Sequence, residues 1–478
     1  MAKQSTTNVP DTSLVATVMT NIRQRISSRA LIAGAKLPSI RSLAETMSVS
    51  KSTVVEAYDR LLSTGVIGAR RGSGFYVAGH APPLALAELG PQLDRAIDPI
   101  WVMRQSLDTS SAALRPGCGW MPRSWLPEAA LRTNLRRLAR YDKAQLTGYS
   151  VPPAGFTPMR QYLSARAATH GIAVSPEQLL LTDSGTHAID LALRFLIKPG
   201  DVVLVDDPCY FNFTTMLRAH RAEVVSVPYT ASGPDVESFA KALAAHKPRL
   251  YITNSGFHNP TGAVIKAAVV HKILKLAEQH DLLIIEDDIY ADFERVAAPR
   301  FATLDGLHRV IQIGSFSKTV SASVRCGYIA ARADWTEQLV DLKLATSFGS
   351  SSFAAELVLG VLSNTAYRRH LRSLHDRLAH ATGETVRRLK QVGLSISHDP
   401  VGGLFVWAQL PDKLSAADIA QRALTQNVVL APGNVFSVSQ SCNRMLRFNV
   451  SQTLTPRVFE VLQSAMEQGV SRRSAKRA

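Results

Sequence analysis

Lys318 stands in a short polar loop that follows an apolar run, Val310–Ile313, of the kind that forms a buried strand. Ser315 and Ser317 precede the lysine, and Arg325 follows it by seven residues. A lysine amine can form a Schiff base with an aldehyde, and serine hydroxyls together with an arginine can hold a phosphate. These residues would therefore suit an aldehyde that carries a phosphate. Taken alone, they would also fit a surface lysine after a strand, so the rest of the chain must decide.

Two further motifs could hold a phosphate and a flat heterocycle. Asp183-Ser-Gly-Thr186 opens a predicted helix after a predicted strand, so its backbone N–H groups and two hydroxyls could face a phosphate. Tyr210 closes the motif Asp206-Asp-Pro-Cys-Tyr210, where its ring could stack on a heterocycle. Many helices begin as the first motif does, and Tyr210 could equally be a packing residue.

The last two motifs could bind the polar atoms of such a ring. Asn259, within Asn254-Ser-Gly-Phe-His-Asn-Pro-Thr-Gly262, could donate a hydrogen bond to a ring oxygen. Asp287 and Tyr290 lie three residues apart and could reach opposite parts of one ring. A carboxylate against a pyridine nitrogen keeps that nitrogen protonated and makes the ring an electron sink. Helix capping is the alternative role for Asp287 or its neighbour Asp288.

The elements that must position these motifs alternate between apolar strands and helices over residues 101–470. This alternation predicts an α/β fold with a mostly parallel sheet, in which ligand groups lie at the C-terminal ends of the strands. The predicted strands are Leu179–Thr182, Val202–Val205, Val224–Val227, Leu250–Thr253, Leu282–Ile285 and Val310–Ile313, with helices such as Thr186–Leu196 and Val269–His280 between them.

Residues 11–79 form a second, smaller pattern. The helical spacing of apolar residues predicts three helices, capped by Ser13, Ser39 and Ser50, and two short strands follow at 66–70 and 75–77. Three helices and a hairpin make a winged helix-turn-helix. The first turn of its third helix would present Lys51, Ser52 and Thr53 to DNA, and the residues placed to touch phosphate are Arg41, Arg70 and Arg71. A helix-turn-helix used only for protein contacts is the alternative.

The net charge of the chain is +16. Residues 1–80 carry ten Lys and Arg against four Asp and Glu, and the tail 471–478 adds four positive residues and no acid. A basic N-terminal segment favours a nucleic-acid-binding module, although ordinary solubilising charge would give the same surplus.

Length and composition bound the remaining possibilities. A chain of 478 residues with 46% hydrophobic and 19% charged residues is typical of a globular protein of two or three domains. The four cysteines are scattered without a CxxC pair, which argues against a disulfide framework and a zinc site, and we expect no bound metal. The sequence has no run of eighteen apolar residues and no signal-peptide pattern, so we expect a cytoplasmic protein without a membrane segment. The expected divisions are a domain at 11–79, a linker at 80–100 rich in Ala, Pro and Gly, a domain at 101–470, and a basic tail at 471–478.

Three runs in the N-terminal segment carry a family resemblance: Leu37-Pro-Ser-Ile-Arg-Ser-Leu-Ala44, Val49-Ser-Lys-Ser-Thr-Val54 and Arg71-Gly-Ser-Gly-Phe-Tyr-Val77. Together they resemble the DNA-binding domain of GntR-family regulators over about 70 residues. The resemblance implies a double-stranded DNA operator as partner, contacted by Arg41, Ser50, Lys51, Ser52, Thr53, Arg70, Arg71 and Gly72.

The motifs of the larger part occur in the order Ser-Gly-Thr, aromatic, Asn-Pro-x-Gly, Asp-x-x-Tyr, Ser-x-Ser-Lys and Arg-x-Gly. This set resembles pyridoxal-phosphate aminotransferases of fold type I over nearly all of residues 101–470. The resemblance implies a small C-terminal α+β part at about 345–470. The resemblance implies catalytic roles for Lys318, as the Schiff-base lysine, and Asp287, as the partner of the pyridinium. It implies further cofactor contacts from Ser184, Gly185, Thr186, Tyr210, Asn259, Tyr290, Ser315, Ser317 and Arg325.

Two more segments fit the same resemblance. Gly148-Tyr149 followed by Gly155 resembles the segment that passes a tyrosine into the neighbouring subunit's site, which implies a homodimer and makes Tyr149 a cofactor contact. Arg447 resembles the arginine that binds the substrate carboxylate, a task for which a bidentate guanidinium is better suited than an amine. Arg444, three residues earlier, is the alternative residue for this role. We interpret His187, His258 and Cys209 as lining or packing residues.

A GntR-type domain ahead of an aminotransferase-like domain resembles the MocR subgroup of bacterial transcription regulators. This resemblance implies a regulator that binds pyridoxal phosphate and responds to the cofactor itself, an amino acid or another amine. A working aminotransferase with an accessory DNA-binding domain is the alternative, because no expected cofactor ligand is missing. A cofactor-carrying scaffold without a DNA target is the third possibility. The intact N-terminal domain favours the regulator, since Arg41, Lys51 and Thr53 have no use in an aminotransferase.

Overall fold

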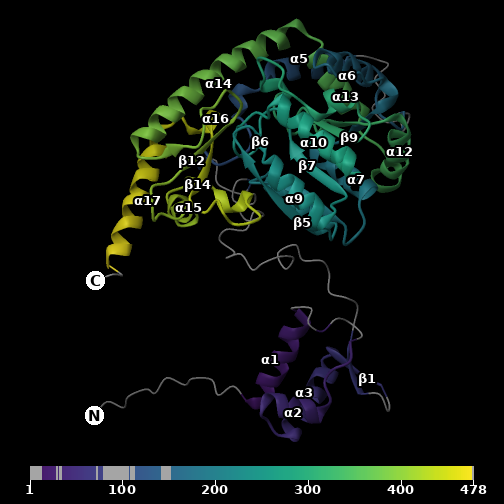
Figure 1. Ribbon diagram of the computed structural model, residues 1–478, viewed down its shortest axis with the longest axis vertical. Coiled ribbons are helices and arrows are strands. Elements are labelled where there is room, and N and C mark those ends of the chain that lie inside the picture. The colour runs from purple at the N-terminus through teal and green to yellow at the C-terminus, as the bar shows by residue number, and fades with distance from the viewer. Residues whose placement is uncertain are drawn as a thin grey trace. The chain divides into compact units, whose positions relative to one another are not determined.

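The computed structural model describes residues 13–27, 31, 35–70, 74–78, 107, 113–140 and 152–475 (Figure 1). The chain divides into two compact units, Met1–Gly90 (unit one) and Pro91–Ala478 (unit two). Within the described residues, no helix has the length and apolar character needed to cross a membrane.

Unit one contains three helices and a hairpin, as the sequence predicts. Buried Val18, Leu43, Val54 and Leu61 pack together in its core, and the Tyr58 hydroxyl donates a 2.7 Å hydrogen bond to the Pro38 carbonyl. The elements are α1 (Leu14–Ser27), α2 (Ile40–Met47), α3 (Lys51–Ser63) and the antiparallel strands β1 (Ile67–Arg70) and β2 (Gly74–Val77).

Unit two is built on an eight-stranded sheet of order β3-β10-β9-β8-β7-β4-β5-β6. The five strands β9, β8, β7, β4 and β5 pair in parallel, whereas β10 is antiparallel to both neighbours and β6 is an antiparallel edge. All six predicted strands are present, and β6 and β10 were not predicted. The bounds are β3 (Leu179–Thr182), β4 (Val202–Asp207), β5 (Glu223–Thr230), β6 (Gly233–Pro234), β7 (Leu250–Asn254), β8 (Leu283–Asp287), β9 (Val310–Ser315) and β10 (Gly327–Ala330).

Helices cover both faces of this sheet because its strands are apolar on both sides. Leu204 and Ile284 pack into one core, and their neighbours Val203 and Ile285 pack into the other. The first core receives α6 (Thr157–Thr169), α9 (Val236–His246), α10 (Ala267–Gln279), α11 (Phe301–Asp305) and α13 (Ser352–Leu362), and the second receives α7 (Gly185–Leu196), α8 (Phe211–Ala219) and α12 (Ala333–Ser347).

A smaller α+β subdomain forms the C-terminal part of unit two (Figure 1). Its antiparallel sheet has the order β11-β12-β14-β13, and Leu114 joins it through backbone hydrogen bonds with Asn427 and Val429. Its elements are α14 (Thr365–Gln391), β11 (Ser395–Ile396), β12 (Phe405–Gln409), α15 (Ala416–Leu424), β13 (Ala431–Pro432), β14 (Met445–Asn449), α16 (Val450–Thr453) and α17 (Pro456–Ala475). The remaining described helices are α5 (Glu128–Ala139) and the 3-10 turns Arg123–Trp125, Pro176–Gln178, Ala291–Phe293 and Gly433–Phe436.

Candidate functional site

Lys318 lies in the loop where β9 ends. Its half-buried side chain donates a 2.8 Å hydrogen bond from Nζ to the Gly119 carbonyl. Burial, and next the positive charge of Arg447, lower the pKa of this amine to about 8. More of the amine is therefore neutral near pH 7 than for an ordinary lysine, and the neutral form is the nucleophile.

Asp287 is the last residue of β8 and is 1% exposed. Asn254 Nδ2 donates to its Oδ2 at 3.0 Å, and the backbone N–H of Ile289 donates to its Oδ1 at 3.3 Å. Burial raises the pKa of Asp287 to about 7. Because no described residue forms an ion pair with this carboxylate, a cationic group placed against it would stabilise its charged form.

Arg447 projects from β14 and is 3% exposed. Its Nη1 donates to Asn259 Oδ1 and its Nη2 to the Gly117 carbonyl, both at 2.7 Å. The guanidinium lies over the rings of Phe405 and Phe436, at 4.4 and 4.7 Å from their centroids. Its buried Nε has no partner among the described residues. A buried guanidinium with an unused donor is suited to an anion.

The rival arginine lies elsewhere. Arg444 forms a 2.7 Å ion pair with the exposed Asp412 and donates to the Leu410 carbonyl at 2.8 Å. The structure therefore places Arg447, and not Arg444, in the site.

Asn259 links Arg447 to Tyr290, since its Nδ2 donates to the Tyr290 hydroxyl at 3.3 Å. Tyr210, directly before α8, interacts electrostatically with both Asp287 and Arg447, and burial raises its pKa to about 12. Four predicted residues from four separate loops or strands thus meet in one place.

A third part of the site gathers at the start of α7. Ser184 caps this helix by accepting a 3.0 Å hydrogen bond from the backbone N–H of His187. A Cβ on Gly185 would lie 3.4 Å from Ser315 Cβ, so the helix start abuts the end of β9. Ser315 and Ser317 hydroxyls are 2.8 Å apart. This arrangement puts hydroxyls and helix N–H groups together, as a phosphate requires.

Two predicted phosphate residues are open to solvent. Thr186 and Arg325 are exposed, and neither makes a side-chain hydrogen bond to a described residue. Arg325 has a positive φ of 57°, in the turn that leads to Gly327 and β10. Tyr149 lies outside the described residues.

The sequence did not single out the segment Gly117–Gly119. Its Gly119 lies between the two charged side chains, because a Cβ there would be 3.8 Å from Lys318 Nζ and 3.9 Å from Arg447 Nη2. A Cβ on Gly117 would lie 2.4 Å from the Ala431 backbone nitrogen, so the close approach requires glycine. The pair of glycines in Gly117-Cys-Gly119 was the only sequence signal.

Asn254 begins one of the predicted motifs, but the sequence did not predict a role for its own side chain. It ends β7, next to Asp287 in the parallel register, and this places its amide on the carboxylate. Of the residues interpreted as packing, His258 is fully buried and stacked on Tyr229 at 3.6 Å between ring centroids, and Cys209 is 1% exposed. His187 lies half-buried at the start of α7, and the Asp183 backbone N–H donates to its Nδ1 at 3.3 Å.

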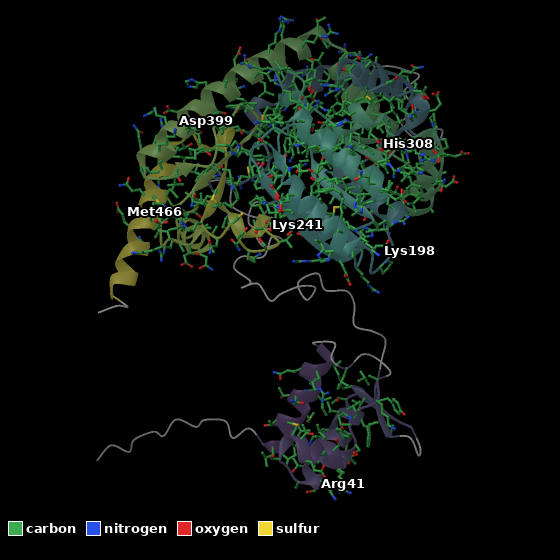
Figure 2. All side chains as sticks on the ribbon, in the orientation of Figure 1. Arg41, Lys198, Lys241, His308, Asp399 and Met466 are labelled. Carbon is green, nitrogen blue, oxygen red and sulfur yellow. The ribbon has the colours of Figure 1, made fainter. Side chains whose placement is uncertain are left out.

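Unit one presents the first turn of α3 to solvent, with Lys51 and Ser52 exposed and Thr53 half-buried. Ser50 caps this helix and accepts a 3.1 Å hydrogen bond from the Thr53 N–H. Arg41 projects outward from α2 (Figure 2) and forms a 3.1 Å ion pair with Glu45. Arg70 ends β1, and its side chain lies outside the described part of the chain, as do Arg71 and Gly72.

Comparisons with known proteins cover both units. Residues 119–465 match the model of the family "Aminotransferase class I and II", and residues 14–77 match "Bacterial regulatory proteins, gntR family". Among curated proteins, the HTH-type transcriptional regulator YdcR of Escherichia coli K12 is 29% identical, over 90% of this chain and 93% of its own. The HTH-type transcriptional regulator NorG of Staphylococcus aureus is 25% identical, over 86% of this chain and 94% of its own.

Solved aminotransferases share the fold of unit two. LysN, an alpha-aminoadipate aminotransferase of Thermus thermophilus solved with N-(5'-phosphopyridoxyl)-L-leucine, is 23% identical with a TM-score of 0.70, over 77% of this chain and 95% of its own. An archaeal alanine:glyoxylate aminotransferase is 23% identical with a TM-score of 0.72, and the match covers 80% of this chain and 98% of that enzyme. The predicted fold class is thus confirmed. The chain belongs to the class I and II aminotransferase family, and it carries a domain of the gntR family of bacterial regulators at its N-terminal end.

Proposed function

We propose that this protein is a transcription regulator of the GntR and MocR type, which binds operator DNA through unit one and senses pyridoxal phosphate or an amino acid or amine through unit two. One observation carries the proposal: the chain that brings Lys318, Asp287 and Arg447 together in one site also exposes the first turn of a capped recognition helix. The curated relatives support it, because they match both units and are named transcriptional regulators.

The residues of unit two fit pyridoxal phosphate. The buried Asp287 carboxylate lacks an ion-pair partner among the described residues, and a pyridinium nitrogen would supply one. The start of α7 and the hydroxyls of Ser184, Ser315 and Ser317 would hold the phosphate, and Asn259 and Tyr290 the ring oxygen. When bound, the coenzyme acts as an electron sink for reactions at an amino group. LysN, of the same fold, was solved with a phosphopyridoxyl amino acid.

Lys318 and Arg447 would have different roles toward an amino acid. Lys318 provides an amine whose lowered pKa favours the neutral, nucleophilic form. Arg447 provides a buried cation for the carboxylate of an effector, with Nε available in addition to the two donors that now bond Asn259 and Gly117. An amino acid could therefore have its amine held near Lys318 and its carboxylate held at Arg447.

We also propose a homodimer through unit two, in the cytoplasm. The exposure of Thr186 and Arg325 supports the dimer, because a second subunit that contributed Tyr149 could cover this side of the site. Domains at 11–79 and 101–470, with a linker between, remain the proposed division of the chain.

The direct test is chemical. Reduction of the purified protein with borohydride, followed by peptide mapping, should place the pyridoxyl group on Lys318, and Lys318→Ala should lose the covalent link while keeping some coenzyme bound. A label on another lysine would refute the assignment. Selection of bound duplexes from a random library would yield the operator, and failure to enrich any sequence would argue against the regulator.

Aminotransferase activity is the second candidate. The observation in its favour is that the described site contains both the nucleophile Lys318 and the carboxylate Asp287. Multiple-turnover transamination at rates of about 1–10³ per second, typical of enzymes, would support it. A single half-reaction without turnover would leave the regulator as the better description.

A further inference from the structure

The positive charge of unit two is concentrated on two helical segments. Six of the sixteen surplus positive charges of the chain belong to residues 1–80 and four to residues 471–478, which leaves six for residues 81–470. Residues 123–140 carry five arginines against one acid, and α14 carries seven Lys and Arg against two acids, a joint surplus of nine. The rest of 81–470 therefore has a net charge of about −3, so the whole positive surplus of this region comes from the two basic segments.

The first turns of α14 hold three arginines that no described acid neutralises. Arg368, Arg369 and Arg372 are exposed, and their spacing of three and four residues puts them on one side of the helix. No carboxylate of a described residue pairs with any of the three, whereas farther along the same helix Glu384 pairs with Arg387 and Arg388.

Helix α13 connects the two basic segments. Helix α13 packs against both α5 and α14, and Arg137 Nη2 would lie 3.0 Å from a Cβ on Gly360, five residues before α14 begins. Arg377 of α14 lies over the Trp125 ring at 4.1 Å, and Trp125 precedes α5 in the sequence. We call Arg368, Arg369 and Arg372 the arginine face.

Stability does not explain these positions. Arg368 and Arg369 stand near the N-terminal end of a 27-residue helix, where the helix dipole favours acidic residues, and the first turn of α14 has none. Arg368 and Arg372 also repel each other at a spacing of four residues. A solvated helix would be more stable with mixed charge, so helix stability does not account for this group of arginines.

We infer that the arginine face binds the phosphate backbone of double-stranded DNA, as a second contact surface beyond the winged helix-turn-helix. Guanidinium groups bind phosphate well, and uncompensated positive charge along one face is the electrostatic footprint of a nucleic-acid surface. The inference rests on the proposed function, because DNA is the polyanion that this chain is proposed to bind. Contacts of this kind would increase the affinity for DNA without contributing to recognition of the base sequence.

The test uses the full chain and a random-sequence duplex, with binding measured by fluorescence anisotropy over a range of salt concentrations. Arg368→Ala/Arg369→Ala/Arg372→Ala should reduce the log–log salt slope by about 0.9 for each phosphate that the variant no longer neutralises. The control Arg194→Ala/Arg332→Ala/Arg457→Ala removes the same charge from arginines paired with Asp190, Asp334 and Glu460, and it should keep the wild-type slope.

Two further results separate a DNA contact from a structural role. The triple Lys variant of the arginine face keeps the charge and should keep most of the slope. The melting temperature of the triple Ala variant should be unchanged or higher, because the substitution relieves repulsion and the dipole conflict. Equal slopes in the arginine-face and control variants, as expected if the face binds a protein, would overturn the inference. A wild-type chain that binds no DNA would instead overturn the proposed function.

Discussion

Arg447 Nη1 donates a 2.7 Å hydrogen bond to Asn259 Oδ1 across 188 residues of sequence. The bond joins β14 of the small subdomain to the loop after β7 of the large sheet. A carboxylate bound at Arg447 would compete with Asn259 for this donor. Effector binding and the contact between the two subdomains are therefore expected to depend on the same guanidinium.

Arg447→Ala should weaken the binding of amino acids to the coenzyme-loaded protein by roughly 10- to 150-fold, the effect of losing a charge-assisted hydrogen bond. Arg447→Lys should restore little, because an ammonium cannot match the planar fork of donors. Titration of the coenzyme absorbance with amino acids measures both. Arg444→Ala, which removes the ion pair with Asp412 and the hydrogen bond to the Leu410 carbonyl, is the control; an equal loss in that variant would refute the assignment.

Asp287 should make the coenzyme-free protein less stable as pH rises. Its folded-state pKa is raised to about 7, and an unfolded Asp titrates near 3.9. Between these values the folded state binds more protons than the unfolded state, so stability falls as pH rises from about 4 to 7. The full penalty, at most about 4 kcal/mol, is present above pH 7.

Asp287→Asn removes this penalty, so it should raise the melting temperature of the coenzyme-free protein more at pH 8 than at pH 5. Asp412→Asn changes an exposed carboxylate and should show no such difference. If Asp287→Asn shifts the melting temperature equally at the two pH values, the Asp287 carboxyl does not have the raised pKa that burial is expected to cause.

Gly117 and Gly383 provide opposite tests of packing. A Cβ on Gly117 meets backbone atoms at 2.4 Å, so Gly117→Ala should destabilise the protein by about 1–3 kcal/mol. Gly383, within α14, has no atom within 4 Å of a Cβ, so Gly383→Ala should stabilise by up to about 1 kcal/mol through helix propensity. Calorimetric unfolding of both variants checks the signs, and a neutral Gly117→Ala would contradict the close approach.

Arg41→Ala should lower the salt slope of DNA binding by about 0.9 and weaken specific and random duplexes alike, because we expect Arg41 to contact phosphate. Its pair with Glu45 is highly exposed and therefore weak, so DNA can compete for the guanidinium. Arg60→Ala breaks a similar pair in the last turn of α3 and should leave the slope unchanged. An unchanged slope in Arg41→Ala would remove this residue from the DNA contacts.

The sequence predicted an element correctly where the residues of that element alone determine its structure. The strands of the parallel sheet are continuous apolar runs. Ser39 and Ser50 directly precede α2 and α3, and their hydroxyls accept hydrogen bonds from backbone N–H groups of these helices. The antiparallel β10 was missed because its four residues follow a turn at Arg325 and pair with β3, far away in sequence.

The candidate site was predictable where a motif ends a strand, as for Asp287 and Lys318. The roles of Gly119 and Asn254 were not, because both depend on neighbours brought close by the fold. Gly119 approaches Lys318 from 199 residues away, and Asn254 reaches Asp287 only through the strand register. Tyr149, Arg71 and Gly72 lie outside the described residues, and their roles stay predictions.

The most direct test of the central claim is titration of the operator DNA with and without pyridoxal phosphate and candidate amino acids, in wild type, Lys318→Ala and Arg447→Ala. We predict that the coenzyme and effector change the DNA affinity of the wild type by roughly 5- to 150-fold, that operator DNA changes effector affinity by the same factor, and that both variants lose the response. Equal DNA affinity with and without coenzyme, together with fast multiple-turnover transamination, would contradict the account and identify the protein as an enzyme.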